Sequence, residues 1–310
     1  MNHQPLVSVI CLCYNHERFV RESLESVLKQ SYENIELIVV DDASTDGSVE
    51  VIRSVIGNRD VQFLSLKENV GNTKAFNRAF RQCSGKYIID LAADDVFFPE
   101  RISKQMGFFE NCSDRVGVIY SDVAYIDEKG QSIENHFASG KYQAHVGDVY
   151  EHLIKEYFIP PPSMMIRRRV LDELNGYDES LAYEDFDFWI RSSRNWDYQF
   201  QPEVLTKVRK VSGSLSSKVY TRDDQQLHSS YLICEKIKEL NKNRPEDQAL
   251  MARLEYEIKH AVISANFQEA ELFVNLYKRV GGSSVLVKVL NLLNKSRLDL
   301  SLIRRILQGK

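Results

Sequence analysis

Two pairs of adjacent aspartates stand at the ends of apolar segments in the first hundred residues. Asp41 and Asp42 end one apolar run, and Asp94 and Asp95 end another. Because adjacent carboxylates repel each other, two such pairs in one sheet need a counter-charge. A divalent ion bound with a diphosphate supplies that charge, and carboxylate oxygens suit Mg²⁺ or Mn²⁺. The alternative for each pair taken alone is a turn or a helix cap.

Other residues near these pairs have side chains that suit a nucleotide. Tyr14 follows a strand-like run, where its ring could stack on a base or pack in the core. Asp42 can accept a hydrogen bond from a base N–H. Lys74 stands near the start of a helical pattern and is either a phosphate contact or an ordinary solvated lysine.

A second acidic cluster lies in the segment YEDFDFWIR, about ninety residues after the first. Phe186, Trp189 and Ile190 share one face of the helix that this spacing predicts, and Glu184 and Asp185 fall in its first turn. A carboxylate here could deprotonate a hydroxyl of an acceptor molecule, which requires hydrogen-bond reach. The alternative is that the acids only complement the helix dipole.

The elements that must position these residues alternate between strand-like and helical patterns. Such alternation predicts a parallel sheet flanked by helices. Ligands of open α/β sheets bind outside the carboxyl ends of the strands, so the polar residues after the first, second and fourth strands should converge. The predicted strands are 6–14, 35–44, 61–66 and 85–95, and the predicted helices are 17–31, 44–57 and 72–83.

Beyond residue 100 the pattern changes. A helix is expected at 99–112 and strands at 116–127 and 198–211, with a polar loop at 128–147 that is long enough to be functional. From about residue 223 the chain reads as helices with few glycines. We therefore predict a domain at 1–220, with a donor half at about 1–100 and an acceptor half at about 101–220, and a helical region at 221–310.

Bulk properties favour a cytoplasmic protein. The net charge of -4 gives no reason to expect a nucleic-acid partner. The five cysteines are scattered without metal-ligand spacing, so we expect free thiols. The N-terminus lacks the pattern of a secretory signal, and no apolar run is long enough to cross a bilayer.

The C-terminal tail is locally basic. Residues 278–310 contain eight basic residues and one acid, interleaved with aliphatic residues. This pattern fits peripheral contact with an anionic membrane, on the inner face of the plasma membrane. The alternative is a helical subdomain packed on the catalytic domain or on a second subunit in a homodimer.

The motifs together resemble those of the family 2 glycosyltransferases, which invert the anomeric centre. The resemblance covers about residues 5–217 and is carried by VSVICLCYNHERFVRESLESVLKQSYENIELIVVDDASTDGS, ENVGNTKAFNRAFRQCSGKYIIDLAADD and NGYDESLAYEDFDFWIR. It implies an α/β protein of the GT-A fold, a Rossmann-like mixed sheet flanked by helices, here with a helical C-terminal extension.

The resemblance also implies roles for the residues named above. Tyr14 would stack on the donor base, Asp42 would bind its N–H, and Asp94 would meet the ribose. Asp95 would bind Mn²⁺ or Mg²⁺ bridging the diphosphate. We assign Glu17 and Lys74 to donor binding as well. Asp185 would be the base that activates the acceptor hydroxyl, with Glu184 and Trp189 at the acceptor site.

Several positions depart from the family pattern. The acidic motif often reads Asp-x-Asp-Asp, but Ala92 occupies its first position here. Many relatives carry a histidine where this chain has Val211, so the only phosphate contact left open in that segment is Arg209. The QxxRW motif of processive synthases is absent, which favours transfer of one sugar per encounter.

The predicted function is metal-assisted transfer of one sugar from a nucleoside-diphosphate sugar to a hydroxyl group. The resemblance favours UDP as the nucleotide, and a glycan or polyprenyl-linked oligosaccharide as the acceptor in cell-surface polysaccharide biosynthesis. One alternative is a non-catalytic protein of the same fold that binds nucleotide sugars or acts as a scaffold. A nucleotidyltransferase is disfavoured, because the segment CLCYNHERF lacks a glycine-rich phosphate loop.

Overall fold

The structure is a computed structural model that describes residues 4–182, 184–211, 220–222 and 225–298. The strands are β1 (Val7–Cys13), β2 (Ile35–Asp41), β3 (Gln62–Ser65), β4 (Tyr87–Ala92), β5 (Val96–Phe97), β6 (Val116–Ile126), β7 (Ser132–Asn135), β8 (Met165–Arg167) and β9 (Asp197–Arg209). The α-helices are α1 (Val20–Leu28), α2 (Ser48–Ile56), α3 (Asn72–Phe80), α4 (Arg101–Glu110), α5 (Tyr150–Lys155), α6 (Arg168–Leu174), α7 (Asp185–Ser192), α8 (Gln225–Leu240), α9 (Arg244–Ile263), α10 (Phe267–Arg279) and α11 (Val285–Ser296); a short 3₁₀ turn covers Pro161–Ser163.

The strands of the described residues form one mixed sheet in the order β3-β2-β1-β4-β8-β6-β9-β5, with β7 paired to β6. Strands β3, β2, β1 and β4 run parallel to one another. Beyond β4 the pairing changes, because β8 is antiparallel to both β4 and β6. The predicted alternation of strands and helices is thus confirmed in the first hundred residues.

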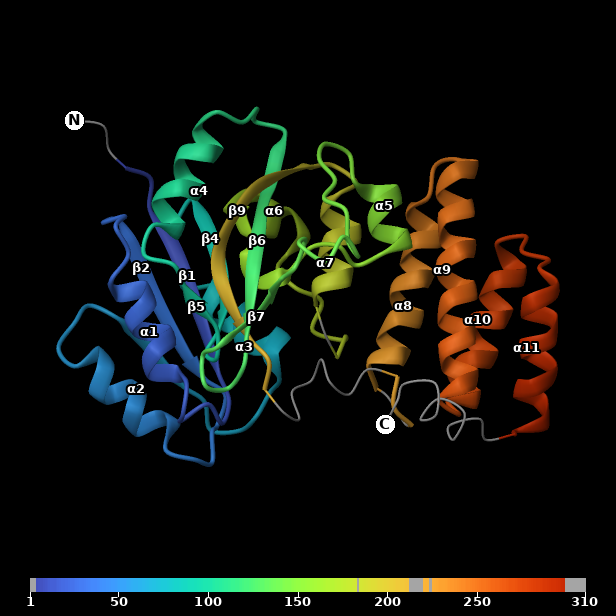
Figure 1. The fold of residues 1–310 in the computed structure, drawn as a ribbon, viewed down its shortest axis with the longest axis horizontal. Helices are drawn as coiled ribbons and strands as arrows, with labels where there is room; N and C mark the ends of the chain where they lie inside the picture. Colours follow the sequence, from blue (N-terminus) through green and yellow to red (C-terminus); the bar gives the residue numbers. More distant parts are fainter. Residues whose placement is uncertain (1–3, 183, 212–219, 223–224, 299–310) are drawn as a thin grey trace. The chain divides into compact units, whose positions relative to one another are not determined.

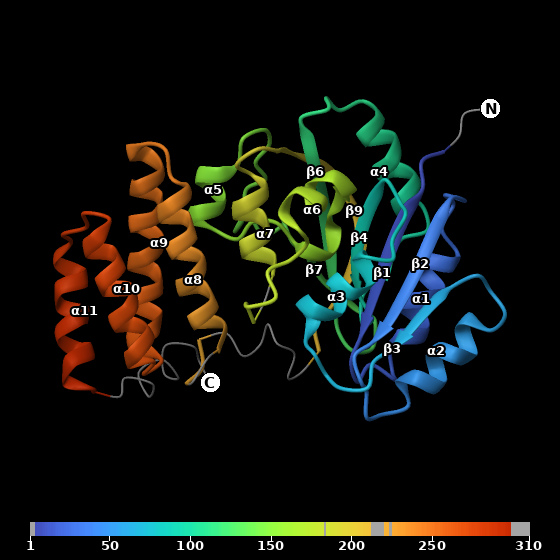
Figure 2. The ribbon, with the colours of Figure 1, turned by 180° about the vertical axis from the view of Figure 1, so that it is seen from behind.

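The core lies on both faces of this sheet. All of β1 is buried, as expected of a continuous apolar run in the centre of a covered sheet. Side chains alternate between faces, so Val7, Val9 and Cys11 share one core cluster with residues of α1, α2 and α4. Helix α3 contacts β1 and β2. Figure 1 shows α1 and α2 in front of the sheet, and Figure 2 shows α3 and α6 on the other side.

The stretch 128–147, predicted as a loop, is folded onto the sheet. It contains the short strand β7, and Gly147 forms a bridge with Tyr198 of β9. His136 and Phe137 pack among aromatic rings, and Phe137 lies 6.4 Å from Tyr120, centroid to centroid. This stretch has no clear hydrophobic period, because β7 is only four residues long and exposes three of them.

The chain divides into two compact units. The first, called the sheet unit, comprises Met1–Val149, Phe158–Glu179 and Arg191–Val211. The second, called the helical unit, comprises Tyr150–Tyr157, Ser180–Ile190 and Ser212–Lys310. The division expected near residue 220 remains a prediction, and α5 and most of α7 belong to the helical unit.

Helix α9 is the centre of the helical unit and contacts α5, α8, α10 and α11. It begins with a reciprocal cap, in which the Asn243 side chain accepts the backbone N–H of Glu246 and donates to the Glu246 carboxylate. Pro245 stands in its first turn, where a missing N–H does no harm. Among the described residues, no helix is both long and apolar enough to span a membrane.

Candidate active site

The carboxyl ends of β1, β2 and β4 lie side by side, because β1 pairs in parallel with both of the other strands. The register places Cys13 opposite Asp41, and Leu12 opposite Ala92. The polar segments after these strands therefore leave the sheet at one edge, which confirms their predicted convergence. The site residues predicted in these segments are Tyr14, Glu17, Asp42, Asp94 and Asp95.

The loops after β1 and β2 are tied to each other. Asn15 and Ala43 both adopt the left-handed backbone conformation, with φ of 57° and 61°. Non-glycine residues rarely do so, Ala less often than Asn. The Asn15 side-chain oxygen accepts the backbone N–H of Thr45 at 2.8 Å, and the Asn15 N–H donates to the Ser44 hydroxyl at 2.9 Å. Each turn therefore supports the other.

His16 and Glu17 extend this connection to the start of α2. The backbone N–H of His16 donates to the Ser48 hydroxyl at 2.9 Å, and that of Glu17 donates to the Asp46 carboxylate at 3.0 Å. The Glu17 carboxylate accepts the N–H of Gly47 at 3.1 Å. The Asp46 carboxylate also accepts the backbone N–H of Ser48, the first residue of α2, at 3.0 Å. The donor-binding role of Glu17 stays a prediction.

Asp42 fixes the loop that precedes α3. Its two carboxylate oxygens accept the backbone N–H groups of Val70 at 2.8 Å and Gly71 at 2.9 Å. Gly71 has a φ of 86°, which glycine adopts without steric cost. Each carboxylate oxygen has a second lone pair, so Asp42 can hold this loop and still accept a ligand N–H. Lys74 follows in the first turn of α3, with its side chain exposed.

Tyr14 faces solvent at the end of β1. Its side chain is 45% exposed, whereas every residue of β1 itself is buried. The alternative that Tyr14 is a packed core residue is therefore wrong. An exposed aromatic ring at this edge is suited to stacking on a base, which remains a prediction.

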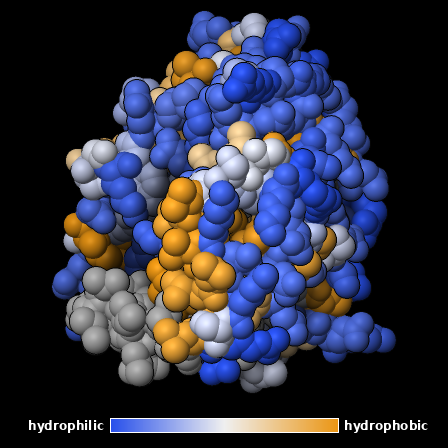
Figure 3. Space-filling model, turned by 90° about the vertical axis from the view of Figure 1, so that its right-hand side faces the viewer, coloured by the Kyte–Doolittle hydropathy of each residue, from blue (hydrophilic) through white to orange (hydrophobic). Residues whose placement is uncertain are grey.

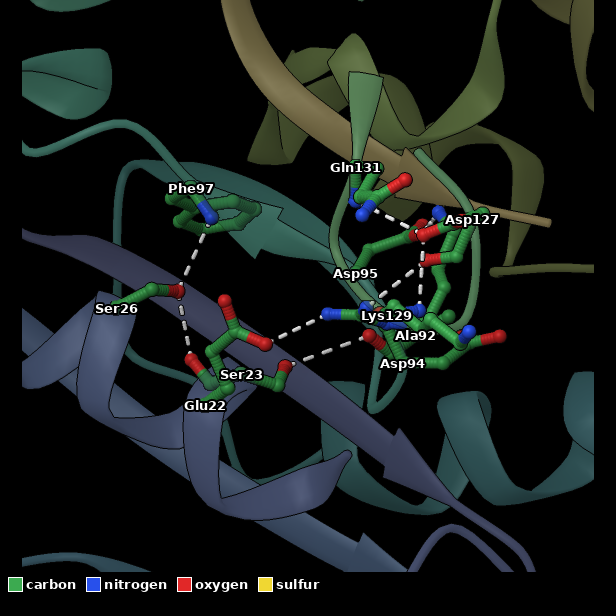
Figure 4. A network of polar contacts seen from close by, with 11 residues as sticks. Glu22, Ser23, Ser26, Ala92, Asp94, Asp95, Phe97, Asp127, Lys129 and Gln131 are labelled. Atoms are coloured by element: carbon green, nitrogen blue, oxygen red, sulfur yellow. Dashed lines mark hydrogen bonds and ion pairs between the residues drawn. The ribbon is translucent and has the colours of Figure 1, made fainter. Parts of the chain in front are cut away.

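Asp94 and Asp95 occupy the turn between β4 and β5, and the end of β9 fixes this turn (Figure 4). The Oδ1 of Asp95 accepts the backbone N–H of Arg209 at 2.9 Å, and the carbonyl oxygen of Asp94 accepts the Nε of Arg209 at 3.0 Å. Asp95 is 3% exposed, and the Asp94 side chain is 14% exposed. The turn thus holds one buried and one partly exposed carboxylate.

The guanidinium of Arg209 is fully engaged by the protein. Besides Asp94, it donates to the Asp127 carbonyl at 3.2 Å through Nη1 and to the Glu22 carboxylate at 2.6 Å through Nη2. It also lies over the Phe19 ring, 4.8 Å from the centroid. Because each of its nitrogens has a protein acceptor and the side chain is buried, we assign Arg209 a structural role in place of the phosphate contact left open by the sequence.

The electrostatics of the turn favour a bound cation. Burial, together with the charge of Asp94, raises the pKa of Asp95 well above the usual range of a carboxyl group; the Arg209 N–H and the charges of Arg101 and Lys210 oppose this. Within the described ranges no Lys or Arg forms an ion pair with either carboxylate, and the His16 Nε2 lies 4.0 Å from the Asp94 Oδ2. A divalent ion here would offset the repulsion between the carboxylates.

The donor set for such an ion is small. Among the described residues, no group of three or more His, Cys, Asp or Glu side chains is placed to hold a metal. Ala92, at the first position of the acidic motif, offers only its carbonyl, which lies 3.4 Å from the Ser23 hydroxyl. A Mg²⁺- or Mn²⁺-type ion at this turn would have to use one or two carboxylates and complete its coordination with substrate phosphates and water.

The predicted acceptor-site residues lie at the beginning of α7. Asp185 is the first residue of α7, so its carboxylate complements the helix dipole. Its side chain is partly exposed. Glu184 is buried, and its carbonyl accepts the Phe188 N–H at 2.9 Å. The Trp189 ring is buried, 6.2 Å from that of Tyr157. The roles assigned to Asp185, Glu184 and Trp189 stay predictions.

Helix α7 is anchored to the other helices of its unit. The buried Asp187 carboxylate lies 2.6 Å from the Nζ of Lys236 on α8. On α9, Arg253 donates its Nε to the Ile154 carbonyl at 2.8 Å and places its guanidinium over the Phe186 ring, 5.2 Å from the centroid. The segment that carries Asp185 is thus held by α8 and α9.

Comparison with known sequences identifies the family. The profile described as "Glycosyl transferase family 2" matches residues 8–175. An uncharacterised glycosyltransferase of Methanocaldococcus jannaschii is 35% identical over 212 residues, which is 66% of this chain and 71% of that protein. One of Rickettsia prowazekii is 32% identical over 67% of this chain and 64% of its own length. The chain belongs to glycosyl transferase family 2 and is a glycosyltransferase.

Solved structures confirm the predicted GT-A fold. Staphylococcus aureus TarS 1-349, crystallised with UDP-GlcNAc, superposes with a TM-score of 0.72 at 20% identity, covering 98% of this chain and 92% of that one. The mannosyltransferase PcManGT of Pyrobaculum calidifontis, in complex with GDP-Man and Mn²⁺, gives a TM-score of 0.59 at 16% identity, covering 95% and 81%. At these identities the likeness establishes the fold alone.

Sequence reasoning missed Asn15, Ser44 and Asp46, which tie the two loops together. It named Arg209 only as an open phosphate contact, and not as the residue that fixes the aspartate turn. The polar cluster after each strand signalled that loops were present. No local pattern signalled which loop would contact which.

Proposed function

We propose that the chain is an inverting glycosyltransferase that moves one sugar from a nucleoside-diphosphate sugar to a hydroxyl group of its acceptor. The observation that carries this proposal is that the exposed Tyr14 and the Asp94–Asp95 pair directly follow two adjacent parallel strands, β1 and β4, at one edge of the sheet. An aromatic ring beside two carboxylates suits a base and a metal-bound diphosphate. UDP is the preferred nucleotide, and the crystallisation of TarS with UDP-GlcNAc supports this choice.

The donor would be held by the sheet unit. Tyr14 stacks on the base, Asp42 accepts a base N–H, and Asp94 contacts the ribose. Glu17 and Lys74 complete the donor site. Asp95 would hold Mn²⁺ or Mg²⁺, and the Mn²⁺ in the PcManGT complex supports a divalent ion as the cofactor. When bound, such an ion stabilises negative charge on the departing diphosphate.

The acceptor would be activated by the helical unit. Asp185 takes the proton from the acceptor hydroxyl while the oxygen attacks the anomeric carbon and the bond to the diphosphate breaks. Attack from the face opposite the leaving group inverts the centre in one displacement. Glu184 and Trp189 shape the acceptor site, Trp189 as a buried support.

The acceptor class proposed is a glycan or a polyprenyl-linked oligosaccharide in cell-surface polysaccharide biosynthesis. We place the reaction in the cytoplasm, with peripheral contact to the inner face of the plasma membrane. A lipid-linked acceptor is reached most directly by an enzyme that rests on the membrane surface.

Calorimetric binding tests the donor site. UDP, GDP and dTDP would each be titrated with and without Mn²⁺ into the wild type, Asp95→Ala, and Asp114→Ala as a control that removes an exposed carboxylate elsewhere. We expect one nucleotide to bind only with Mn²⁺, and Asp95→Ala to lose that binding while Asp114→Ala keeps it. Failure of all three nucleotides to bind the wild type would contradict the proposal.

Transfer itself separates an enzyme from a non-catalytic binding protein. Asp185→Asn should bind the nucleotide as the wild type does, because Asp185 lies outside the sheet unit. It should lower the transfer rate by about a hundredfold or more, since general-base catalysis contributes about that much. Equal transfer rates for Asp185→Asn and the wild type would exclude Asp185 as the base.

A further inference from the structure

Helix α11 of the helical unit has one packed face and one apolar face that faces solvent. Val287, Leu290 and Asn294 are buried on the packed face, which contacts α9 and α10. The opposite side is defined here as the apolar face of α11 and consists of Val285, Leu286, Val289 and Leu292, which are 72%, 49%, 49% and 67% exposed. Figure 3 shows hydrophobic side chains gathered on the side of the molecule where α11 lies.

This face is not explained by folding of the described residues. An amphipathic helix normally turns its apolar residues toward the core and its polar residues toward solvent. Here the packed face already contains apolar residues, yet four more aliphatic side chains remain in water. Contiguous exposed apolar surface of this kind marks an interaction site.

The charged side chains of α11 itself are all basic. Lys288 and Lys295 are exposed and two helical turns apart, so they line one edge of the face next to Leu292. Arg297 is exposed just after the helix. No acidic residue occurs in α11. A partner that binds this face must therefore offer both an apolar region and negative charge.

We propose that the apolar face of α11 docks on the surface of an anionic lipid bilayer. The aliphatic side chains would enter the boundary between headgroups and acyl chains, and the basic residues would lie among the headgroups. The helix has twelve residues, too few to cross the hydrocarbon layer, so it lies in the plane of the surface. This deepens the location proposed above and names the surface responsible.

A second copy of the chain fits this face less well. A symmetric dimer through α11 would bring the same lysines of both copies to one interface, where no acid of α11 offsets them. An anionic bilayer offers both an apolar layer for the aliphatic side chains and negative charge for the lysines.

Vesicle flotation of the full-length chain tests the proposal without any transfer assay. The vesicles would be phosphatidylcholine alone, or phosphatidylcholine with phosphatidylglycerol. We expect the wild type to float with the anionic vesicles at least tenfold more than with the neutral ones, and the bound fraction to fall at high salt. No flotation with anionic vesicles would overturn the proposal.

Matched variants locate the surface. Leu286→Gln/Val289→Gln/Leu292→Gln should reduce the bound fraction about tenfold, and Lys288→Glu/Lys295→Glu should reduce it at low salt. The control is Ile133→Gln/Val146→Gln, which changes two side chains of the sheet unit that are 56% and 55% exposed and should leave flotation unchanged. Flotation of the triple variant at the wild-type level would contradict the assignment.

Two further readouts complete the design. Circular dichroism and thermal unfolding would confirm that each variant is folded, which is expected because the substituted side chains face solvent. Light scattering after size exclusion would give the mass in solution. If the triple variant converts a dimer to a monomer while lipid binding persists, the occupant is a second copy and the lipid proposal is wrong.

Discussion

The Nη2 of Arg209 and the carboxylate of Glu22 lie 2.6 Å apart, although 187 positions separate the two residues in the chain. Arg209 ends β9, and Glu22 lies in the first turn of α1. The same guanidinium donates to the backbone of Asp94 and Asp127. One buried side chain therefore links a helix, a long strand and the turn that carries the candidate metal ligand.

Arg209→Ala should lower the free energy of unfolding by about 3 kcal/mol, because it removes several hydrogen bonds at once and leaves buried acceptors unpaired. It should also weaken metal-dependent nucleotide binding, since the aspartate turn loses its support. Urea unfolding measures the first effect and calorimetry the second. The control is Arg115→Ala, which breaks an exposed pair with Asp197 and should change neither measurably. Equal stability losses in the two variants would contradict the role given to Arg209.

Lys236→Met should destabilise the protein by about 3 kcal/mol, because it removes the ammonium group 2.6 Å from the buried Asp187 carboxylate. Adding Asp187→Leu to Lys236→Met should recover part of that loss, since the buried charge is then gone. Unfolding in urea measures both variants. Lys155→Met, in an exposed pair with Glu151, is the matched control and should have little effect. If the double variant were less stable than Lys236→Met, the unpaired Asp187 carboxylate would not be the cause of the stability loss.

His136 should make the free energy of unfolding depend on pH. The Phe158 carbonyl can only accept, so the Nε2 of His136 carries the proton and donates at 3.0 Å, and the Nδ1 accepts from the Tyr125 hydroxyl at 2.7 Å. Burial lowers the pKa of His136. The unfolded chain, with a His pKa of about 6.5, then binds more protons in mildly acidic solution, and the free energy of unfolding falls as the pH drops below that value.

His136→Gln should remove this contribution while keeping a donor for the Phe158 carbonyl. The measurement is the difference in unfolding free energy between about pH 8 and about pH 5.5, on either side of the ordinary histidine pKa. We expect that difference to be smaller in the variant than in the wild type. An unchanged difference would mean that other groups cause the acid sensitivity.

Ala43→Gly should stabilise the protein by about 0.5–1 kcal/mol, because Ala43 has a φ of 61° and glycine adopts that conformation without the clash of a Cβ. Thermal unfolding measures the effect. Ala138→Gly provides the comparison, since Ala138 lies in a turn outside the left-handed region, and glycine there should destabilise slightly. Destabilisation by Ala43→Gly would show that the loss of chain entropy outweighs the relief of strain.

Much of the sheet unit could be predicted from local sequence. The apolar runs that contain β1, β2 and β4 are continuous because both faces of the sheet are covered, and helices alternate with them. The order of these elements is enough to place the aspartates at one edge of the sheet. The stretch 128–147 could not be predicted in this way, because it is held by aromatic contacts with β6 and β9 and has no period of its own.

The sequence by itself determined most strands and helices of the first hundred residues, the family of the chain, and which carboxylates stand at strand ends. Only the tertiary structure decided that Arg209 binds the turn of Asp94 and Asp95, that the Asn15 and Ala43 loops support each other, and that the helix of Asp185 is anchored by Lys236. The physical reason is the distance along the chain over which each effect acts. Periodicity and turn chemistry act between near neighbours, whereas the partner of a buried polar group is set by the packing of distant segments.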